Sequence, residues 1–224
     1  MELPKHIAIS PDDISDWCRK NNKRLEEGCE RYFKQLAGIL ELQTRLNIPI
    51  FTVYLLPDDA DKPNEDYAAF SDFMANFFSQ LADNPVVSGH KMKISIFGKW
   101  YNLPGKAVES LKKVIEETKE FDSFFVNFCI NYDGQEEIVD ACRLIAKQVG
   151  LGKLDAEMIT KENIKENIYS SYFLPPDIIL IYGERRLSGL LLWDSSKSKI
   201  VFADKSFMEF EESDIENLNR NLFK

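Results

Sequence analysis

The 224-residue sequence has no long apolar run and no metal- or redox-type cysteine spacing. None of its hydrophobic stretches reaches the roughly 18–20 residues that a membrane span needs. Residues 1–5 lack the charged and then apolar layout of a signal peptide, so we expect neither a span nor a secretory leader. The cysteines form no Cys-x-x-Cys pair, which favours reduced thiols in a cytoplasmic protein: Cys18, Cys29, Cys129 and Cys142.

The sequence also lacks an excess of basic residues. Its formal net charge is −9, and the acidic residues are spread along the whole chain. Nucleic-acid binding normally needs a positively charged face, so we expect no nucleic-acid partner. The two histidines, His6 and His90, have no partner visible in the sequence, and we interpret both as structural.

Six short β-rich runs are present, and they alternate with helical patterns. The predicted strands span 6–9, 49–56, 92–98, 124–132, 177–183 and 199–204, and the predicted helices span roughly 25–46, 65–83, 105–119, 134–149 and 183–193. Residues 151–171 are polar and weakly helical. Residues 50–56 and 178–181 are continuous apolar runs, which are typical of parallel strands covered on both faces.

This alternation predicts an α/β fold with a central six-stranded, mostly parallel sheet flanked by helices. No repeat, low-complexity tract or linker divides the chain, so residues 1–224 are expected to form a single domain. Ligands of such sheets bind outside the carboxyl ends of the strands. The loops that follow the six strands are therefore the place to look for a site.

Four segments, in order along the chain, carry a family resemblance. Residues 6–17 end in Asp-Asp-Ile-Ser-Asp-Trp, and residues 130–135 read Ile-Asn-Tyr-Asp-Gly-Gln. Residues 183–193 read Gly-Glu-Arg-Arg-Leu-Ser-Gly-Leu-Leu-Leu-Trp, and residues 202–210 form an acidic tail. These segments resemble the first strand and loop, the Asn-Tyr strand end, the diphosphate-binding segment and the closing strand of cis-prenyltransferases. That family extends isoprenoid diphosphates with Z double bonds.

The sequence departs from the family pattern at several positions. The Gly-Asn-Gly-Arg of the first loop is absent, and the His-x-x-Gly element reads Leu-Glu-Glu-Gly at 25–28. The first of the two arginines that hold the second substrate's diphosphate falls near Ile181, and the metal-binding Glu falls near Lys199. The Arg-x-Gly tail is missing. These differences predict a reaction other than ordinary elongation with isopentenyl diphosphate.

Asp12 matches the family position that helps a diphosphate leave. Breaking an allylic C–O bond requires the diphosphate to be neutralised, usually by Mg²⁺ held by carboxylates. Asp13 and Asp16 complete an Asp-Asp-x-x-Asp pattern, so we predict a Mg²⁺ site of Asp12, Asp13 and Asp16, with Asp12 and Asp16 catalytic. The alternative is an ordinary helix start, in which Ser10 is the N-cap and Pro11 follows at N1.

The resemblance also implies diphosphate contacts after the fifth strand. Arg186 and Ser188 match the family motif residue by residue, and Arg185 is a further candidate. Arginine can donate two hydrogen bonds to one phosphate, and serine adds a hydroxyl donor. The alternative is a solvated helix start in which the arginines pair with Glu184.

Two more polar positions are candidates. Asn131, at the Asn-Tyr strand end, is predicted to orient a leaving group, although a turn-forming Asn is the alternative. Arg19 is predicted to replace the missing cation of the first loop, as part of a basic run with Lys20, Lys23 and Arg24; a solvated face is the alternative there.

An aromatic helix follows the second strand. In the family the corresponding helix lines a hydrocarbon tunnel, so the resemblance predicts tunnel residues Tyr67, Phe70, Phe73, Met74 and Phe77. Such bulky residues would shorten the tunnel and suggest a C10–C20 ligand. The alternative is a Phe-rich core or a dimer face.

Three functions follow from these residues and the resemblance. The first is Mg²⁺-assisted ionisation of one allylic prenyl diphosphate, whose carbocation is then cyclised or quenched, as in terpene synthases. The second is transfer between two prenyl diphosphates, possibly with irregular regiochemistry. The third is a catalytically silent subunit of an active cis-prenyltransferase. The resemblance also implies a homodimer.

Overall fold

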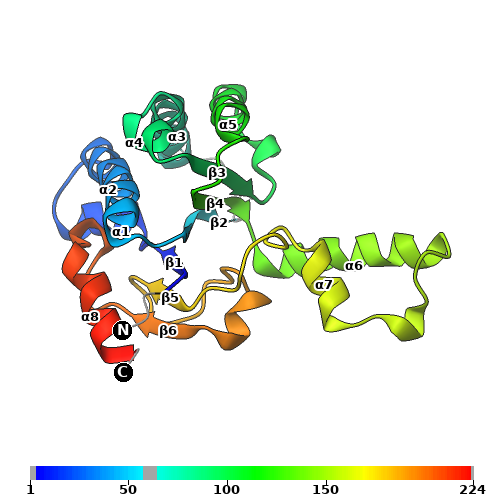
Figure 1. Ribbon diagram of the computed structural model, residues 1–224. Coiled ribbons are helices and arrows are strands. Elements are labelled where there is room, and N and C mark those ends of the chain that lie inside the picture. Colours follow the sequence, from blue (N-terminus) through cyan, green and yellow to red (C-terminus); the bar gives the residue numbers. More distant parts are fainter. Residues whose placement is uncertain (1–3, 58–64, 223–224) are drawn as a thin grey trace.

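A computed structural model describes residues 4–57 and 65–222, which form one sheet with both faces covered (Figure 1). The six strands are all parallel, in the order β3-β4-β2-β1-β5-β6. They are β1 (His6–Ser10), β2 (Ile50–Pro57), β3 (Met92–Phe97), β4 (Phe124–Tyr132), β5 (Ile178–Ile181) and β6 (Lys199–Phe202). The predicted fold class and the six predicted strands are confirmed.

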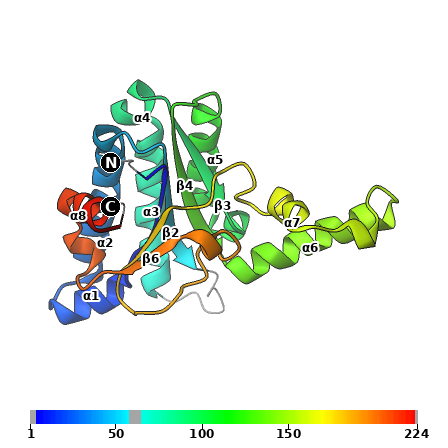
Figure 2. The same ribbon diagram turned by 60° about the horizontal axis from the view of Figure 1, so that its bottom comes forward.

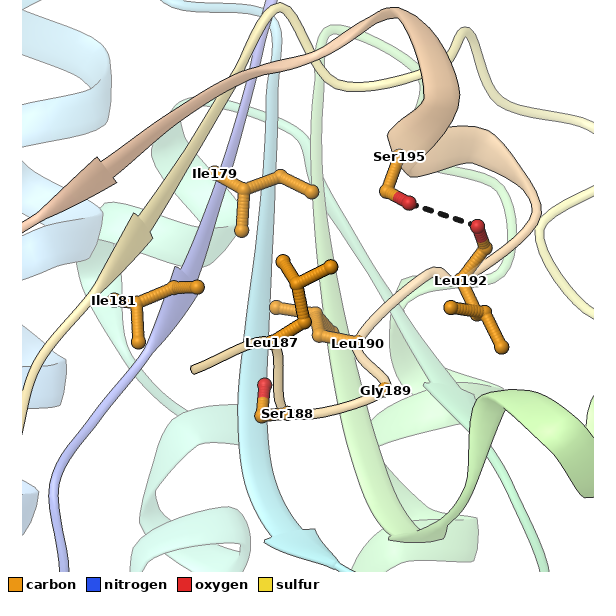
Figure 3. A pocket seen from close by; sticks show the side chains of 8 residues that line it. All are labelled: Ile179, Ile181, Leu187, Ser188, Gly189, Leu190, Leu192 and Ser195. Carbon is orange, nitrogen blue, oxygen red and sulfur yellow. Dashed lines mark hydrogen bonds between the residues drawn. The ribbon is translucent and has the colours of Figure 1, made fainter. Parts of the chain in front are cut away.

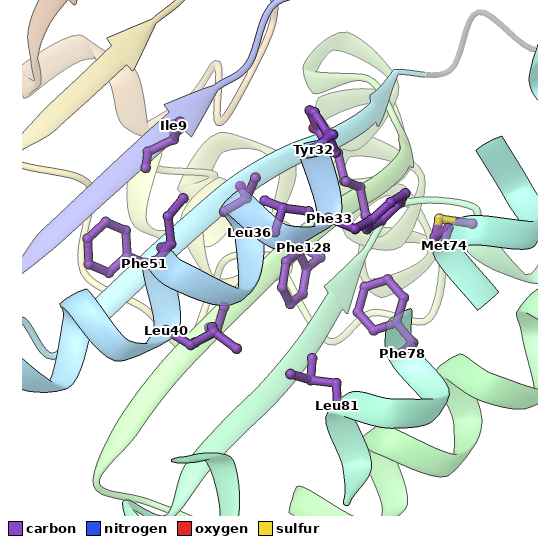
Figure 4. Close-up of a cluster of buried hydrophobic side chains, with 14 of the residues drawn as sticks. Ile9, Tyr32, Phe33, Leu36, Leu40, Phe51, Met74, Phe78, Leu81 and Phe128 are labelled. Atoms are coloured by element: carbon purple, nitrogen blue, oxygen red, sulfur yellow. The ribbon is translucent and has the colours of Figure 1, made fainter. Parts of the chain in front are cut away.

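One face of the sheet is covered by helices. These are α2 (Leu25–Leu46), α3 (Glu65–Ala82), the short α4 (Pro85–Gly89) and α5 (Gly105–Thr118). Their apolar side chains interlock with those of the strands, as Leu36 of α2, Phe78 of α3 and Phe128 of β4 show in Figure 4. The central strands β1, β2 and β5 are buried on both faces, which is why β2 and β5 appear in the sequence as continuous apolar runs rather than alternating ones.

The opposite face of the sheet is covered mainly by irregular chain. Phe173, Leu190 and Leu191 pack there against Ala8, Tyr54 and other strand residues. Helix α6 (Gly134–Gly150) begins at this side and projects away from the sheet, and α7 (Lys161–Asn167) returns beside it (Figure 2). Asp133 caps α6 by accepting hydrogen bonds from the backbone N–H groups of Gln135 and Glu136, at 2.7 and 2.9 Å. We refer to α6 and α7 together as the arm.

The helix expected at 183–193 is not formed, so that prediction is wrong. The segment is a chain of turns that ends in a 3₁₀ turn, η3 (Asp194–Lys197). Gly183 and Gly189 both have φ of +81°, and Leu191 has φ of +46°, values that a right-handed helix cannot contain. The apolar run 190–193 is helix-like in pattern, but it covers the sheet instead.

The other predicted helices are present within a residue or two of their expected ends. The weakly helical segment 151–171 contains α7 and the 3₁₀ turn η2 (Ala156–Met158). Helix α1 (Ile14–Lys20), the turn η4 (Phe207–Glu209) and α8 (Glu212–Leu222) complete the chain. No helix within 4–57 and 65–222 combines the length and apolarity that a membrane crossing requires.

His6 is structural, and its partners lie in elements far away in the sequence. Its Nδ1 lies 2.6 Å from the carbonyl oxygen of Leu174, and its Nε2 lies 2.8 Å from the Thr52 hydroxyl. Asn127 donates to the same hydroxyl at 3.1 Å. A neutral imidazole satisfies both of these hydrogen bonds, with Nδ1 donating to Leu174 and Nε2 accepting from Thr52. Burial lowers the pKa of His6 from 6.5 to about 4.

This lowered pKa predicts an acid-sensitive fold. Below pH 6.5 the unfolded chain binds a proton on His6 that the folded chain does not bind, so stability falls as the pH is lowered from about 6.5 towards 4. Between pH 7.5 and 5 the free energy of unfolding should lose roughly 2 kcal/mol through this residue. Urea unfolding of the wild type and of His6→Gln at both pH values measures it. An equal pH dependence in the two proteins would contradict the assignment.

Candidate functional site

The site lies where β1 and β5 run side by side. The connection after β1 leads to β2 on one side of the sheet, and the connection after β5 leads to β6 on the other. The two loops therefore set out in different directions from the carboxyl ends of the strands, the usual ligand position in such sheets, and we call this strand-end region between them the crevice. Ser10 ties the loops together, since its hydroxyl donates to Ser188 Oγ at 3.0 Å and its carbonyl accepts from the Tyr182 N–H at 2.9 Å.

Asp12 lies at the centre of this crevice and is half-buried. Its Oδ1 accepts a hydrogen bond from the Phe207 N–H at 2.8 Å and another from the Ser206 hydroxyl at 3.1 Å. Gly183 approaches Asp12 so closely that a Cβ there would lie 2.8 Å from the Asp12 Cβ. Asp12 therefore contacts the segments that follow β5 and β6 at once, and no local sequence pattern predicts these contacts.

The three carboxylates of the Asp-Asp-x-x-Asp pattern do not converge. Asp13 is the N-cap of α1, and its Oδ1 accepts from the Asp16 N–H at 2.9 Å. Asp16 forms an exposed ion pair with Arg19 at 2.5 Å. Within the described parts of the chain, no three His, Cys, Asp or Glu side chains are grouped as a metal site would require. The predicted three-carboxylate Mg²⁺ set is thus not assembled.

The alternative reading of this segment is also corrected. A helix does begin here, but its N-cap is Asp13 rather than Ser10, three residues later than expected. Ser10 instead ends β1, and Asp12 lies in the loop before the helix. Helix α1 is held against α2 at Gly28, where a Cβ would overlap the Cys18 sulfur and lie 2.9 Å from an Ile14 methyl group. This close packing fixes the start of α1 beside the site.

The loop of residues 183–193 carries both predicted arginines on its exposed side. Arg185 pairs with Asp204, and Arg186 pairs with Glu184, so each cation has an acidic partner. Ser188 is half-buried and lines a small hollow (Figure 3), whose other lining residues are Ile179, Ile181, Leu187, Gly189, Leu190, Leu192 and Ser195. In this hollow the Ser188 hydroxyl lies beside apolar side chains, next to the crevice.

Asn131 ends β4 with a φ of +48°. Its side-chain amide donates to the Lys99 carbonyl at 3.1 Å, and its own carbonyl accepts from the Lys99 N–H at 2.8 Å. Asn131, which lies within β4, therefore joins the end of β4 to the segment that follows β3. Its Oδ1 is buried and has no hydrogen-bond partner among the described residues. A catalytic role for Asn131 stays a prediction.

The predicted tunnel residues line a space that aromatic rings fill. Met74 is fully buried, and Tyr67, Phe70, Phe73 and Phe77 are half-buried against the core. The ring of Phe33 lies 5.4 Å from that of Phe70 and 5.3 Å from that of Phe77. Figure 4 shows Phe33 and Tyr32 of α2 directed towards this space. The α2 residues were not predicted, although their helical spacing on an apolar face could have suggested them.

The aromatic cluster reaches the crevice. The Tyr32 ring lies 5.3 Å from that of Phe207, which in turn lies 5.7 Å from that of Tyr182. The Tyr182 hydroxyl is buried without a hydrogen-bond partner among the described residues. Burial, with the charges of Asp214 and Asp12, raises its pKa. An apolar aromatic region thus adjoins a polar crevice, an arrangement suited to a ligand with an apolar chain and an anionic head.

The contacts of Asp12 predict a role in stability as well as in any chemistry. Asp12→Ala would leave the buried Phe207 N–H without an acceptor, which should cost about 1–3 kcal/mol of unfolding free energy. Asp12→Asn keeps an acceptor oxygen and should lose less. Denaturant unfolding and hydrogen exchange at the Phe207 amide measure both effects. Wild-type stability and exchange in Asp12→Ala would contradict this role.

Comparisons with known proteins identify the family of the chain. Residues 12–221 match the family described as "Putative undecaprenyl diphosphate synthase". The chain is 32% identical over 214 residues to a tritrans,polycis-undecaprenyl-diphosphate synthase (geranylgeranyl-diphosphate specific) of Methanocaldococcus jannaschii, covering 90% of this chain and 74% of that protein. A protein of the same description from Methanopyrus kandleri is 30% identical over 95% of this chain and 79% of its own length.

A solved structure has the same fold. Lavandulyl diphosphate synthase from Lavandula x intermedia, in complex with dimethylallyl diphosphate, matches with a TM-score of 0.90 at 22% identity, over 96% of this chain and 93% of that one. The chain belongs to the undecaprenyl diphosphate synthase family of cis-prenyltransferases and is a prenyltransferase-type enzyme that acts on prenyl diphosphates.

Proposed function

We propose that this enzyme transfers a prenyl group between two short prenyl diphosphates. The observation that carries the proposal is the contact between the loop after β1, which bears Asp12, and the arginine-bearing loop after β5: Ser10 donates to Ser188, and Gly183 lies against Asp12. One side offers a carboxylate, and the other offers hydroxyl and guanidinium donors. Two anionic head groups can be bound there side by side. The relatives named for undecaprenyl diphosphate synthesis support transfer of this kind.

Asp12 is the residue proposed to act on the allylic diphosphate. Mg²⁺ is commonly held in proteins by one or two carboxylates together with substrate phosphates. Asp12 fits that arrangement, because only its Oδ1 is engaged by Ser206 and Phe207. Mg²⁺ bound there would neutralise the leaving diphosphate. Asp12 would orient that head group, while the apolar rings of Tyr32 and Phe207 would exclude water from the allylic carbon.

The second diphosphate is assigned to Arg186 and Ser188, with Arg185 as an additional contact. Both arginines are exposed and paired with acidic side chains of similar exposure. Such surface pairs contribute little energy, so a diphosphate can replace the carboxylates at small cost. Arg19, which is also exposed and paired, would need only to leave Asp16 to contribute a further cation.

Ionisation of a single substrate, followed by cyclisation or quenching, is the second candidate. In the sequence, the additional acidic residues Asp13 and Asp16 favour this reaction. In the structure Asp13 caps α1, and Asp16 pairs with Arg19. The two-substrate reaction needs only Asp12 and the loop of residues 183–193. We therefore place transfer ahead of cyclisation. Both reactions begin with the same ionisation step, which would require Asp12 in either case.

The arm is the proposed contact with a second copy of the chain. Exposed apolar residues lie on α6 and on the connection from α6 to α7: Val139, Leu144, Leu151, Met158 and Ile159. Exposed apolar positions along one projecting element are typical of interaction surfaces. We propose a homodimer formed through α6 and α7.

The test of the function is turnover of purified protein with geranyl, farnesyl or geranylgeranyl diphosphate and Mg²⁺. Each is incubated alone and with isopentenyl or dimethylallyl diphosphate, and products are identified by mass spectrometry. We expect a product only when two diphosphates are present, and a loss of at least about a hundredfold in Asp12→Asn, because the charge is lost while the fold is kept. A product from one substrate alone would favour cyclisation instead. Wild-type turnover by Asp12→Asn would exclude Asp12 from the reaction.

The filled space between α2 and α3 predicts a limit on chain length. Phe77→Ala removes a ring that contacts Phe33, Phe78 and Phe128, so it should allow products at least one C5 unit longer. Phe124→Ala is the matched control, because Phe124 is half-buried at the opposite end of β4. Product masses from the three proteins decide the matter. Unchanged products in Phe77→Ala would place the hydrocarbon elsewhere.

A further inference from the structure

A buried ion pair lies beneath the end of the loop of residues 183–193. Asp194 follows the loop directly, and only 4% of its surface is exposed. Its Oδ2 lies 2.6 Å from the Lys165 ammonium group and accepts from the Ser170 hydroxyl at 2.7 Å. Lys165 also donates to the Ser170 carbonyl at 3.0 Å. The carboxylate is therefore paired and hydrogen-bonded, as a buried charge must be to be tolerated.

These contacts join the loop to the arm. Lys165 belongs to α7, and Ser170 belongs to the segment by which the chain returns from α7 to β5. Asp194 is the first residue of η3. The polar contacts thus connect parts of the chain that are 24 and 29 residues apart. Removal of one partner from such a buried pair strongly destabilises the place where it lies.

The loop has a second attachment on the same side. Leu191 and Tyr132 belong to one buried cluster, and the Tyr132 hydroxyl donates to Glu137 Oε2 at 2.7 Å. Glu137 is fully buried, and its Oε1 accepts from the Tyr169 N–H at 3.0 Å.

Backbone packing adds a third attachment. A Cβ at Gly134 would overlap the Gly189 carbonyl oxygen, so the loop lies directly on the start of α6. The Ser188 hydroxyl is also hydrogen-bonded to Ser10. These contacts hold the loop from beneath and from the side, while Arg185 and Arg186 remain exposed.

We propose that Asp194 is a positioning residue, which with Lys165 and Ser170 fixes the loop of residues 183–193 so that Arg186 and Ser188 are ready to bind a diphosphate. Asp194 does not touch the substrate. A loop without this anchor has to be ordered by the ligand itself, and binding becomes weaker by the cost of that ordering. This assignment rests on the proposed function for its effect on turnover, but the anchoring itself does not.

Hydrogen exchange tests the anchoring without any substrate. We expect the amides of residues 187–192 to exchange at least about tenfold faster in Asp194→Ala than in the wild type. Lys165→Met should have a similar effect, and the double variant should be little worse than either, because one interaction is removed in all three. Arg45→Met is the control, since Arg45 joins α2 to Glu212 of α8, away from the loop. Wild-type exchange of these amides in Asp194→Ala and Lys165→Met would overturn the proposal.

Kinetics then test the positioning. The KM for the second diphosphate should rise about tenfold in Lys165→Met, with kcat within about twofold, because saturating substrate orders the loop. Arg45→Met should keep both constants. A loss of kcat with an unchanged KM in Lys165→Met would overturn the proposal, because it would indicate a general effect on the fold. If the wild type turns over no substrate pair, the proposed function fails, and binding of inorganic pyrophosphate replaces KM as the quantity that must weaken.

Discussion

The parallel pairing of β1 with β5 is the constraint on which the site depends. Ser10 pairs with Ile181 in the register of the two strands, so the loops that follow leave the sheet at the same level. The Tyr182 N–H extends this pairing by one hydrogen bond to the Ser10 carbonyl. Because the next connections run in opposite directions, the two loops lead away from each other beyond these first contacts. The positions of Asp12 and Ser188 both follow from this register.

Glycine makes the narrow approach between these loops possible. Gly183 has a positive φ and lies against Asp12, so a larger residue would be strained and would also displace the carboxylate. The site is therefore specified by backbone geometry as much as by its polar side chains. Asp12 in turn accepts the Phe207 N–H, which connects the loop after β1 to the turn before α8. The residue proposed for chemistry thus also holds the carboxyl-terminal segment in place.

The strands could be predicted from the sequence because burial on both faces leaves a local signal, an unbroken apolar run. The loop of residues 183–193 could not, since its three successive leucines have the helical pattern while their actual role is to cover a sheet. The same limit applies to Asp13 and Asp16. Their spacing suits a metal site, but the side-chain cap at Asp13 shifts the helix start and directs Asp16 outwards. The contacts of Asp12 with Ser206 and of Asp194 with Lys165 span 194 and 29 residues and leave no trace in any local pattern.

The charges around the crevice bear on how a diphosphate can enter it. Arg185 and Arg186 are matched by Asp204 and Glu184, so these four side chains together contribute no net charge, and Asp12 adds a carboxylate that has no ion pair among the described residues. A diphosphate approaching this site meets a net negative field unless a cation accompanies it. Mg²⁺ carried by the substrate would remove that repulsion and use the oxygen of Asp12 that Phe207 does not engage. The arginines could then exchange their weak surface pairs for the bound phosphates. Under the proposed function, electrostatics would therefore favour a diphosphate that arrives together with its cation, and the arginines of the loop would exchange partners afterwards.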